Sequence, residues 1–378
     1  TGAPEGVKGI SLFVVPKFMV NPDGSLGARN DVHCVSIEHK LGIKASPTAV
    51  LQYGDHGGAV GYLVGQENRG LEYMFIMMNA ARYAVGVQGI SVADRAYQKA
   101  TQYARDRVQS RPVDGSIKAA APIIHHPDVR RMLMTMRAYT EGCRAMASVA
   151  AAAYDAAHHH PDADTRRQNQ SVYEFLVPLV KGYSTEMSLE VTSLGVQVHG
   201  GMGFIEETGA AQYYRDAKIL TIYEGTTAIQ ANDLVGRKTV RDGGQTPKAL
   251  AAQMQTTEKA LLALGTADAT AIGKRLSAGR QALLDVVDFM VQAGAHDPNA
   301  AYAGSVPYLM LAGNVVAGWQ LGRAYLAAHA ATEDAAFMQA KMATPRFYAD
   351  HILCKAPGLR DSIVEGAHSV TAMALDSF

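Results

Sequence analysis

The stretch DVRRMLMTMRAYTEGCRAMASVAAAAYDAA, residues 128–157, decides the class of the fold. Apolar and small residues recur in it every three or four positions, and most of its arginines fall outside that series. This spacing gives a helix one continuous apolar face, which has to pack against other parts of the protein. The residues of this face are Val129, Met132, Leu133, Met136, Tyr139, Cys143, Met146, Ala147 and Ala150.

Helical patterns fill most of the chain after residue 70. The segment 71–107 contains no proline and is rich in Ala, Met, Arg and Gln, which favour helices. Thr226 is the expected N-cap of a helix over 227–237. Further helices are predicted over 248–264, 268–293, 304–329, 333–352 and 359–375.

The region between these helices contains a predicted loop and a predicted helix start. A polar loop is expected over 158–170. After it, Ser171 and Glu174 fit a capping box, in which each side chain satisfies a free backbone N–H group. Pro178 follows closely, so the helix is expected either to kink there or to begin there.

Residues 1–70 have strand character instead. Short runs of β-branched and aromatic residues occur at 9–16, 32–37, 48–53 and 61–64, and glycine, proline, asparagine and aspartate separate them. This pattern predicts a small antiparallel sheet or barrel. About three to five strands fit, which is a thin core, so we expect its partner segment to be absent or supplied elsewhere.

The composition excludes several classes of protein. Hydrophobic residues make up 48% of the 378 residues and charged residues 19%, which rules out general disorder. The 35 basic and 35 acidic residues balance, so no net basic field supports binding to nucleic acid or to an anionic membrane. The longest apolar stretch, 308–319, is too short to span a bilayer. The three cysteines are far apart and have no CxxC spacing, and no other motif predicts a metal site.

The segment TIYEGTT, residues 221–227, places Glu224 just ahead of a predicted helix start. A carboxylate there lies in a favourable field, and an apolar ligand that covers it raises its pKa and makes it a stronger base. An ordinary surface or capping acid fits the same position, so the spacing alone leaves both interpretations open.

A glycine-rich turn and a pair of arginines are two further candidates. VHGGMGF, residues 198–204, exposes backbone N–H groups to a planar or phosphorylated ligand, although a plain tight turn is the alternative. It does not fit the GxGxxG fingerprint, because Glu206 takes the last glycine position. Arg105 and Arg107 end the helix 71–107 and either grip a phosphate group or complement the helix dipole.

Taken together, seven motifs resemble the acyl-CoA dehydrogenase family in their order and spacing. They are KGISLFVV (8–15), KLGIKASPT (40–48), GQENRGL (65–71), ARDR (104–107), QVHGGMGF (197–204), RDAKI (215–219) and IYEGT (222–226). The resemblance covers residues 1–238. Residues 239–378 resemble the C-terminal extension of the family's larger members, the 3-methylmercaptopropionyl-CoA dehydrogenase type.

The resemblance implies a mainly α fold with a small β part. Residues 1–70 are expected to form the C-terminal part of the family's middle β-barrel, residues 71–238 the catalytic four-helix bundle, and residues 239–378 an additional helical domain. The family's N-terminal helical domain and the first half of its barrel are then missing from this chain, in line with the thin strand core.

The activity that the resemblance implies is flavin-dependent α,β-dehydrogenation of an acyl-CoA thioester. The substrate is expected to be 3-methylmercaptopropionyl-CoA or another short or medium acyl-CoA. Glu224 matches the glutamate that removes the α-proton, whereas Ala81 stands where a minority of members carry this base. The backbone N–H of Glu224 is expected at the thioester carbonyl, and Arg82, Tyr223 and Gly225 are expected in the substrate site.

The cofactor implied is FAD, which accepts the hydride from the β-carbon. Arg107 matches an arginine that reaches the pyrophosphate of a neighbouring subunit's flavin. Gln197, Gly200 and Gly201 match the segment that crosses to the adenosine side of that flavin. Thr226 matches a threonine near the FAD phosphates of its own subunit.

The partners implied are an acyl-CoA substrate, an electron-transfer flavoprotein as electron acceptor, and further copies of the chain in a dimer or a dimer of dimers. The expected location is the bacterial cytoplasm. Two alternatives stay open: an acyl-CoA oxidase, which shares the base, and an inactive, truncated helical fragment that only oligomerises. Ser110 and Ala228 depart from the aromatic and the glutamine that the family often has there, which affects only local contacts with FAD.

Overall fold

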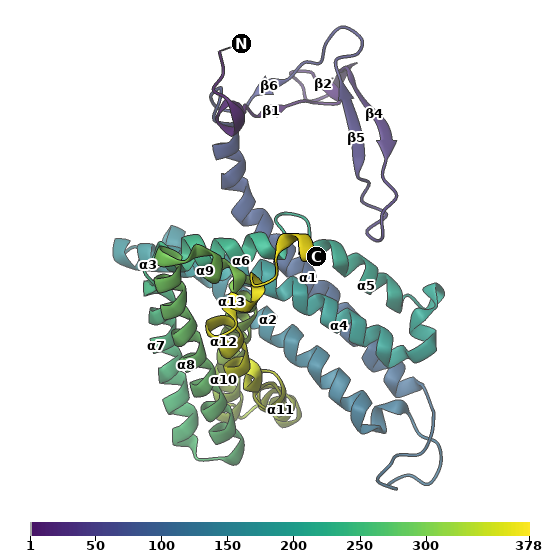
Figure 1. Ribbon diagram of the computed structural model, residues 1–378. Coiled ribbons are helices and arrows are strands. Elements are labelled where there is room, and N and C mark those ends of the chain that lie inside the picture. Colours follow the sequence, from purple (N-terminus) through teal and green to yellow (C-terminus); the bar gives the residue numbers. More distant parts are fainter. Residues whose placement is uncertain (1) are drawn as a thin grey trace. The chain divides into compact units, whose positions relative to one another are not determined.

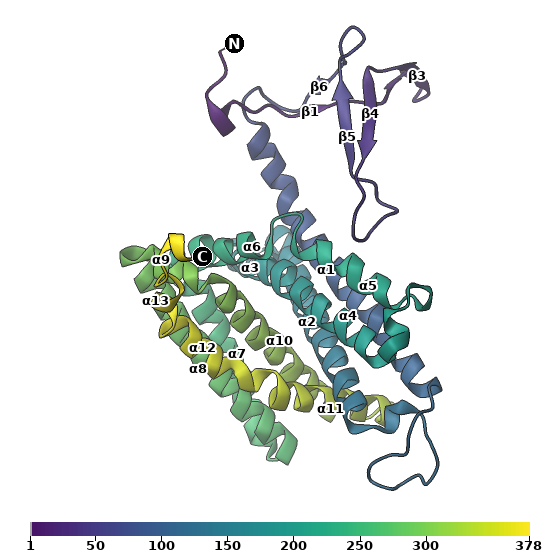
Figure 2. The ribbon, with the colours of Figure 1, turned by 45° about the vertical axis from the view of Figure 1, so that its right-hand side comes forward.

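The computed structural model describes residues 2–378, and most of them are helical (Figure 1, Figure 2). The chain divides into two compact units, one that ends at Ala81 and one that runs from Arg82 to Phe378. The division falls inside one long helix, α1 (Gly70–Asp106). The predicted class, mainly α with a small β part, is confirmed.

The first unit contains short antiparallel strand pairs, β1–β6, β2–β3 and β4–β5. Within residues 2–378 these pairs do not close into a barrel. The expected strands over 32–37 and 48–53 are confirmed as β4 and β5. Strands β2 and β3 were not predicted, because they are too short to show an alternation of apolar and polar residues. The elements are η1 (Gly6–Gly9), β1 (Phe13–Val14), β2 (Phe18–Val20), β3 (Leu26–Arg29), β4 (Val32–Ile37), β5 (Ala49–Tyr53) and β6 (Tyr62–Leu63).

This first unit has almost no apolar core of its own. Among its described residues only Asn30, Gly42 and Gly70 are buried. Apolar side chains of the β4–β5 pair stay open to solvent, for example Ile37 at 58% and Tyr53 at 49% exposure. The strands therefore show the thin core that the sequence predicts.

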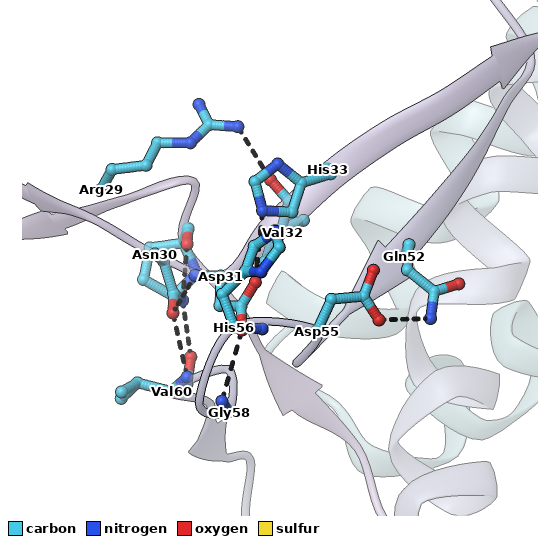
Figure 3. A network of polar contacts seen from close by, with 11 residues as sticks. Arg29, Asn30, Asp31, Val32, His33, Gln52, Asp55, His56, Gly58 and Val60 are labelled. Carbon is cyan, nitrogen blue, oxygen red and sulfur yellow. Dashed lines mark hydrogen bonds and ion pairs between the residues drawn. The ribbon is translucent and has the colours of Figure 1, made fainter.

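A polar network holds the loops of the first unit together (Figure 3). The Asn30 amide donates to the carbonyls of Pro16 and Val60, each at 2.8 Å, and its oxygen accepts from the Val60 N–H. The Asp31 carboxylate accepts from the His56 N–H at 2.6 Å, and this bond is the main cause that lowers the pKa of Asp31. Hydrogen bonds thus replace much of the missing apolar packing.

The second unit is a packed set of helices, and its core is one continuous apolar cluster. No helix among residues 2–378 combines the length and the apolar character that crossing a membrane requires. Besides α1, the α-helices are α2 (Pro127–His159), α3 (Ala163–Pro178), α4 (Ser184–His199), α5 (Ala210–Lys218), α6 (Thr227–Val235), α7 (Gln245–Leu264), α8 (Ala267–His296), α9 (Pro298–Ala303), α10 (Ser305–Ala330), α11 (Ala335–His351), α12 (Ala356–Val364) and α13 (Ala367–Val370). The π-helical segments are η3 (Leu179–Tyr183) and η7 (Gly236–Val240), and the 3-10 turns are η2 (Ile123–His125), η4 (Gly200–Phe204), η5 (Glu206–Thr208), η6 (Ile219–Thr221), η8 (Leu353–Lys355) and η9 (Leu375–Ser377).

Helix α2 confirms the interpretation of residues 128–157. Its buried face includes Met132, Met136, Cys143 and Met146, at the predicted intervals. Helices α3, α4, α10 and α11 pack around it. The apolar periodicity was therefore sufficient to identify the core face of this helix.

The predicted start of α3 is wrong. The helix begins nine residues earlier, where the Asp162 carboxylate caps it by accepting from the Thr165 N–H at 2.8 Å. Ser171 lies inside the helix and bonds back to the Arg167 carbonyl, so it forms no capping box. At Pro178 the chain neither stops nor restarts, because α3 continues through the π-helix η3 into α4.

Helix α10 joins the earlier and later helices of the second unit. It contacts α2, α6 and η3 as well as α7, α8, α11 and α12, and it is buried along most of its length. The Tyr183 hydroxyl of η3 donates to Asn314 Oδ1 of α10 at 2.8 Å and lies 3.1 Å from the Tyr348 hydroxyl of α11. A Cβ at Gly313 would meet the Tyr183 ring at 2.2 Å, so this contact requires glycine. The apolar core is thus continuous across residues 238 and 239.

Candidate functional site

Glu224 lies on a short loop between η6 and α6. Its φ is 56°, a left-handed conformation that is uncommon outside glycine and often found at functional sites. Gly225 follows at φ 90°, and a Cβ there would lie 2.7 Å from Gln230 Nε2. Any other residue at the second position of this turn would therefore be strained.

Hydrogen bonds from two buried side chains hold this loop. Nζ of Lys181 donates to the Gly225 carbonyl at 2.5 Å. Nε2 of Gln230 approaches the Glu224 and Gly225 carbonyls at 3.3 and 3.4 Å. The Thr226 hydroxyl accepts from the Ile229 N–H at 3.3 Å, which confirms Thr226 as the N-cap of α6.

The carboxylate of Glu224 remains available for chemistry. It is half-buried, and within residues 2–378 it has no hydrogen-bond or ion-pair partner. Its negative charge raises the pKa of Lys181, which burial lowers to about 8. An unpaired carboxylate near a buried ammonium group can take up a proton without first breaking a bond of its own.

The residues predicted around the substrate lie beside this loop. Arg82 of α1 is buried, and its Nη1 lies 3.3 Å from Asp233 Oδ2 of α6. The Tyr223 hydroxyl donates to Gln88 Oε1 of α1 at 2.7 Å. The structure therefore brings Arg82, Tyr223, Gly225 and Thr226 to one place with Glu224.

The other predicted cofactor residues lie at the far end of α1. The Tyr103 ring of α1 stacks on the His199 ring of α4 at 4.3 Å, so the C-terminal ends of both helices meet there. Arg107 follows α1, and Gln197 lies in the last turn of α4. At 1.5 Å rise per residue, Arg82 and Arg107 are separated by about 37 Å along α1.

The glycine turn after α4 is open. Gly200 has φ 59°, and a Cβ at Gly200 or at Gly201 would meet no atom within 4 Å. The Gln197 side chain beside it is exposed. A ligand can therefore approach the backbone of this turn closely, as the sequence suggested.

Comparison with known proteins identifies the family. Residues 68–238 match the family model for the acyl-CoA dehydrogenase C-terminal domain, and residues 250–374 match the model described as acetyl-CoA dehydrogenase C-terminal like. The chain is 56% identical to 3-methylmercaptopropionyl-CoA dehydrogenase of Ruegeria pomeroyi over 376 residues. The chain belongs to the acyl-CoA dehydrogenase family. The family resemblance read from the seven motifs is thereby confirmed.

The chain covers only part of these relatives. The alignment with the Ruegeria pomeroyi enzyme spans 99% of this chain and 63% of the relative. The broad-specificity linear acyl-CoA dehydrogenase FadE5 of Mycobacterium tuberculosis is 37% identical over 389 residues, which is 96% of this chain and 62% of FadE5. An acyl-CoA dehydrogenase from Bacillus anthracis complexed with FAD has a TM-score of 0.71 at 20% identity, over 97% of this chain and 62% of that one. The acyl-CoA dehydrogenase fold is thereby confirmed.

Four residues beside Glu224 were not predicted for this acyl-CoA dehydrogenase family member: Lys181, Gln230, Asp233 and Gln88. Lys181 carried a usable signal, because it is the only charge in the apolar run FLVPLVKGY, residues 175–183. A lone lysine in such a run is either solvated or held by a buried partner. The other three are polar residues on amphipathic helices, where position along the sequence does not reveal a partner.

Asp31, His33 and His56 could in principle hold a metal ion, since their donor atoms lie within 4.8 Å of one another. Both Asp31 oxygens already have partners, however. One contacts His33 Nε2 at 3.2 Å, and the other accepts from the backbone of His56 (Figure 3). The loop-closing network accounts for this cluster, and the absence of a metal site stays a prediction.

Proposed function

We propose that this protein catalyses the FAD-dependent α,β-dehydrogenation of an acyl-CoA thioester, with Glu224 as the base that removes the α-proton. The observation that carries the proposal is the Glu224 loop, which combines a left-handed backbone with an unpaired, half-buried carboxylate. An acyl chain that covered this carboxylate would remove water from it, which strengthens a carboxylate as a base. The family match supports the same assignment.

Residues around the loop suit the remaining tasks at the substrate. The left-handed turn leaves the Glu224 N–H available as a donor for the thioester carbonyl, where charge develops as the α-proton leaves. The N-cap Thr226 fixes the start of α6, so the loop is joined to a rigid element. Tyr223, bonded to Gln88, anchors the other side of the turn to α1.

The residues present also fit a dinucleotide cofactor. The open backbone at Gly200 and Gly201 allows close approach of a flat or phosphorylated group. The Arg107 guanidinium has no ion-pair partner within residues 2–378 and is exposed, so it is free to bind a phosphate. FAD, when bound, supplies a hydride acceptor.

The separation of the two residue groups supports an oligomer. About 37 Å of chain, nearly all of it in α1, separates Arg82 beside the Glu224 loop from Arg107. We propose that Arg107, Gln197, Gly200 and Gly201 serve the flavin of a neighbouring subunit, in a dimer or a dimer of dimers. Thr226 then belongs to the flavin site of its own subunit.

The finer assignments rest on the relatives. The 56% identity to the Ruegeria pomeroyi enzyme makes 3-methylmercaptopropionyl-CoA the first substrate to test, alongside other short and medium acyl-CoAs. Turnover across such a panel identifies the chain length. An electron-transfer flavoprotein is the proposed electron acceptor, and we retain 1–70, 71–238 and 239–378 as the proposed domains.

Glu224→Gln tests the assignment of the base. The variant should retain bound FAD, seen as its visible absorbance, and should lose bleaching of that absorbance by acyl-CoA by roughly 10²–10⁴-fold. Glu207→Gln is the matched control, because Glu207 is an exposed glutamate on η5. Bleaching at the wild-type rate in Glu224→Gln would exclude Glu224 as the base.

A further inference from the structure

Lys181 is a buried charge that the proposed chemistry does not yet use. Among residues 2–378 it is the one lysine that is fully buried, at 0% exposure. Burying an ammonium group is unfavourable unless hydrogen bonds and opposite charges compensate it. Within the described part of the chain its ammonium group donates to the Gly225 carbonyl, which belongs to the residue directly after Glu224.

The segment that carries Lys181 is firmly held. It is the π-helix η3, a form that occurs often at functional sites. On one side, a Cβ at Gly86 of α1 would come within 2.4 Å of the Val180 carbonyl. On the other side, Tyr183 bonds to Asn314 of α10. The backbone on both sides of Lys181 is therefore held in place against α1 and α10.

The charges around Lys181 come from three elements. Burial is the main cause that lowers its pKa to about 8. Glu186 of α4 and Glu224 of the loop raise that pKa, and Arg82 of α1 lowers it. Lys181 is therefore still mainly protonated at pH 7 and acts there as a charged donor.

We propose that Lys181 is a positioning residue for the base: its ammonium group fixes the Gly225 carbonyl and thereby keeps Glu224 in its left-handed conformation. This inference rests on the proposed role of Glu224. A charge-assisted hydrogen bond to a backbone carbonyl sets the orientation of the whole peptide plane. Without it, among the described residues only the longer side-chain contacts from Gln230 remain to the Glu224 and Gly225 carbonyls.

Loss of the Lys181 ammonium group is expected to lower the rate of flavin bleaching more than it weakens substrate binding. A displacement of about 1 Å in a reacting group can lower the rate by roughly a hundredfold. Lys181 touches the loop backbone and not the acyl chain, so the substrate concentration for half-maximal rate should change little. A residue that only stabilised the fold would instead lower the melting temperature without this selective loss of rate.

The test compares the FAD-loaded Lys181→Met and Lys238→Met variants with wild type. Methionine keeps the apolar stem and removes the charge and the donors. Lys238 is the matched control, because it forms an ion pair with Glu174 at 2.7 Å and is 17% exposed. Two quantities are measured: the limiting rate of flavin bleaching with its half-saturating acyl-CoA concentration, and backbone hydrogen exchange in peptides covering residues 219–231.

Lys181→Met should lower the limiting rate roughly 10- to 100-fold, with half-saturation within about threefold of wild type. Amides of the loop should exchange faster in this variant only, while Lys238→Met should match wild type in both measurements. Wild-type rate and wild-type exchange in Lys181→Met would overturn the proposal, and so would equal losses in both variants. If Lys181→Met does not fold, Lys181→Gln replaces it in the same comparison.

Glu224→Gln, measured in parallel, separates this inference from the proposed function. If Glu224→Gln still bleaches the flavin at the wild-type rate, the assignment of Glu224 as the base in the proposed function fails. If Glu224→Gln is inactive and Lys181→Met behaves as wild type, only the role of Lys181 fails.

Discussion

The ion pair between Arg82 and Asp233 allows a quantitative test of how α1 and α6 are joined beside Glu224. Nη1 of Arg82 lies 3.3 Å from Oδ2 of Asp233, and both side chains are only 8% exposed. Asp233→Asn keeps the size of the side chain but leaves the guanidinium group buried without its counter-charge. Breaking a buried pair in this way costs about 3–5 kcal/mol. The upper part of that range is expected, because Lys181 is a second buried cation close to Arg82.

Thermal unfolding converts this free energy into a measurable shift. With an unfolding entropy of about 2.1 cal/mol/K per residue over the unit Arg82–Phe378, Tm should fall by roughly 6–8 °C. Arg237→Gln is the matched control, because Arg237 reaches the other oxygen of Asp233 at 3.4 Å but is 61% exposed. An exposed ion pair contributes about 0–1 kcal/mol, so this control should lower Tm by no more than about 2 °C.

A double variant shows whether the unpaired charge causes the loss. Arg82→Met combined with Asp233→Leu replaces the pair by apolar side chains and should recover most of the stability. A Tm for Asp233→Asn within about 1 °C of wild type would refute the reasoning, since the guanidinium group would then have adequate solvation without Asp233.

Two further predictions concern the loop and its lysine. Gly225→Ala should lower the free energy of unfolding by about 1–3 kcal/mol and remove most flavin bleaching, because φ is 90° there and the new Cβ would lie 2.7 Å from Gln230 Nε2. The control is Gly243→Ala, at φ 62° with open space around it, which should keep the wild-type bleaching rate. Equal bleaching rates in the two variants would contradict this prediction. The difference in Tm between wild type and Lys181→Met should increase in favour of wild type between about pH 8 and pH 10.5. Burial lowers the pKa of Lys181 from the usual 10.5 to about 8, so the unfolded chain binds more protons than the folded chain in that interval, and folding becomes more favourable as the pH rises. Parallel Tm curves for the two proteins across that interval would show that the lysine does not titrate in this way.

Signals within a few residues predicted much of the fold correctly. The apolar series in α2 and the N-cap at Thr226 each depend on side chains one or two helical turns apart. The start of α3 was predicted wrongly because two segments of the chain each have the residues of a helix N-terminus. Asp162 caps the helix first, and the capping-box pattern at Ser171 then falls in its interior.

The candidate site was predictable only in part. The IYEGT motif and its resemblance to a known family identified Glu224 and its neighbours, and the structure brings Arg82, Tyr223 and Gly225 to the same place. The partners that hold them, above all Lys181 and Asp233, were not predicted.

The sequence by itself determined the helical class and the face that α2 buries, because these follow from the spacing of apolar residues. Only the tertiary structure decided that Lys181 meets the Gly225 carbonyl and that Arg82 meets Asp233. The partners in these two pairs are 44 and 151 residues apart in the chain, so no local pattern encodes them. Packing of η3 against α1 and α10 holds Lys181 in place, and the unfavourable burial of an unpaired charge favours both pairs.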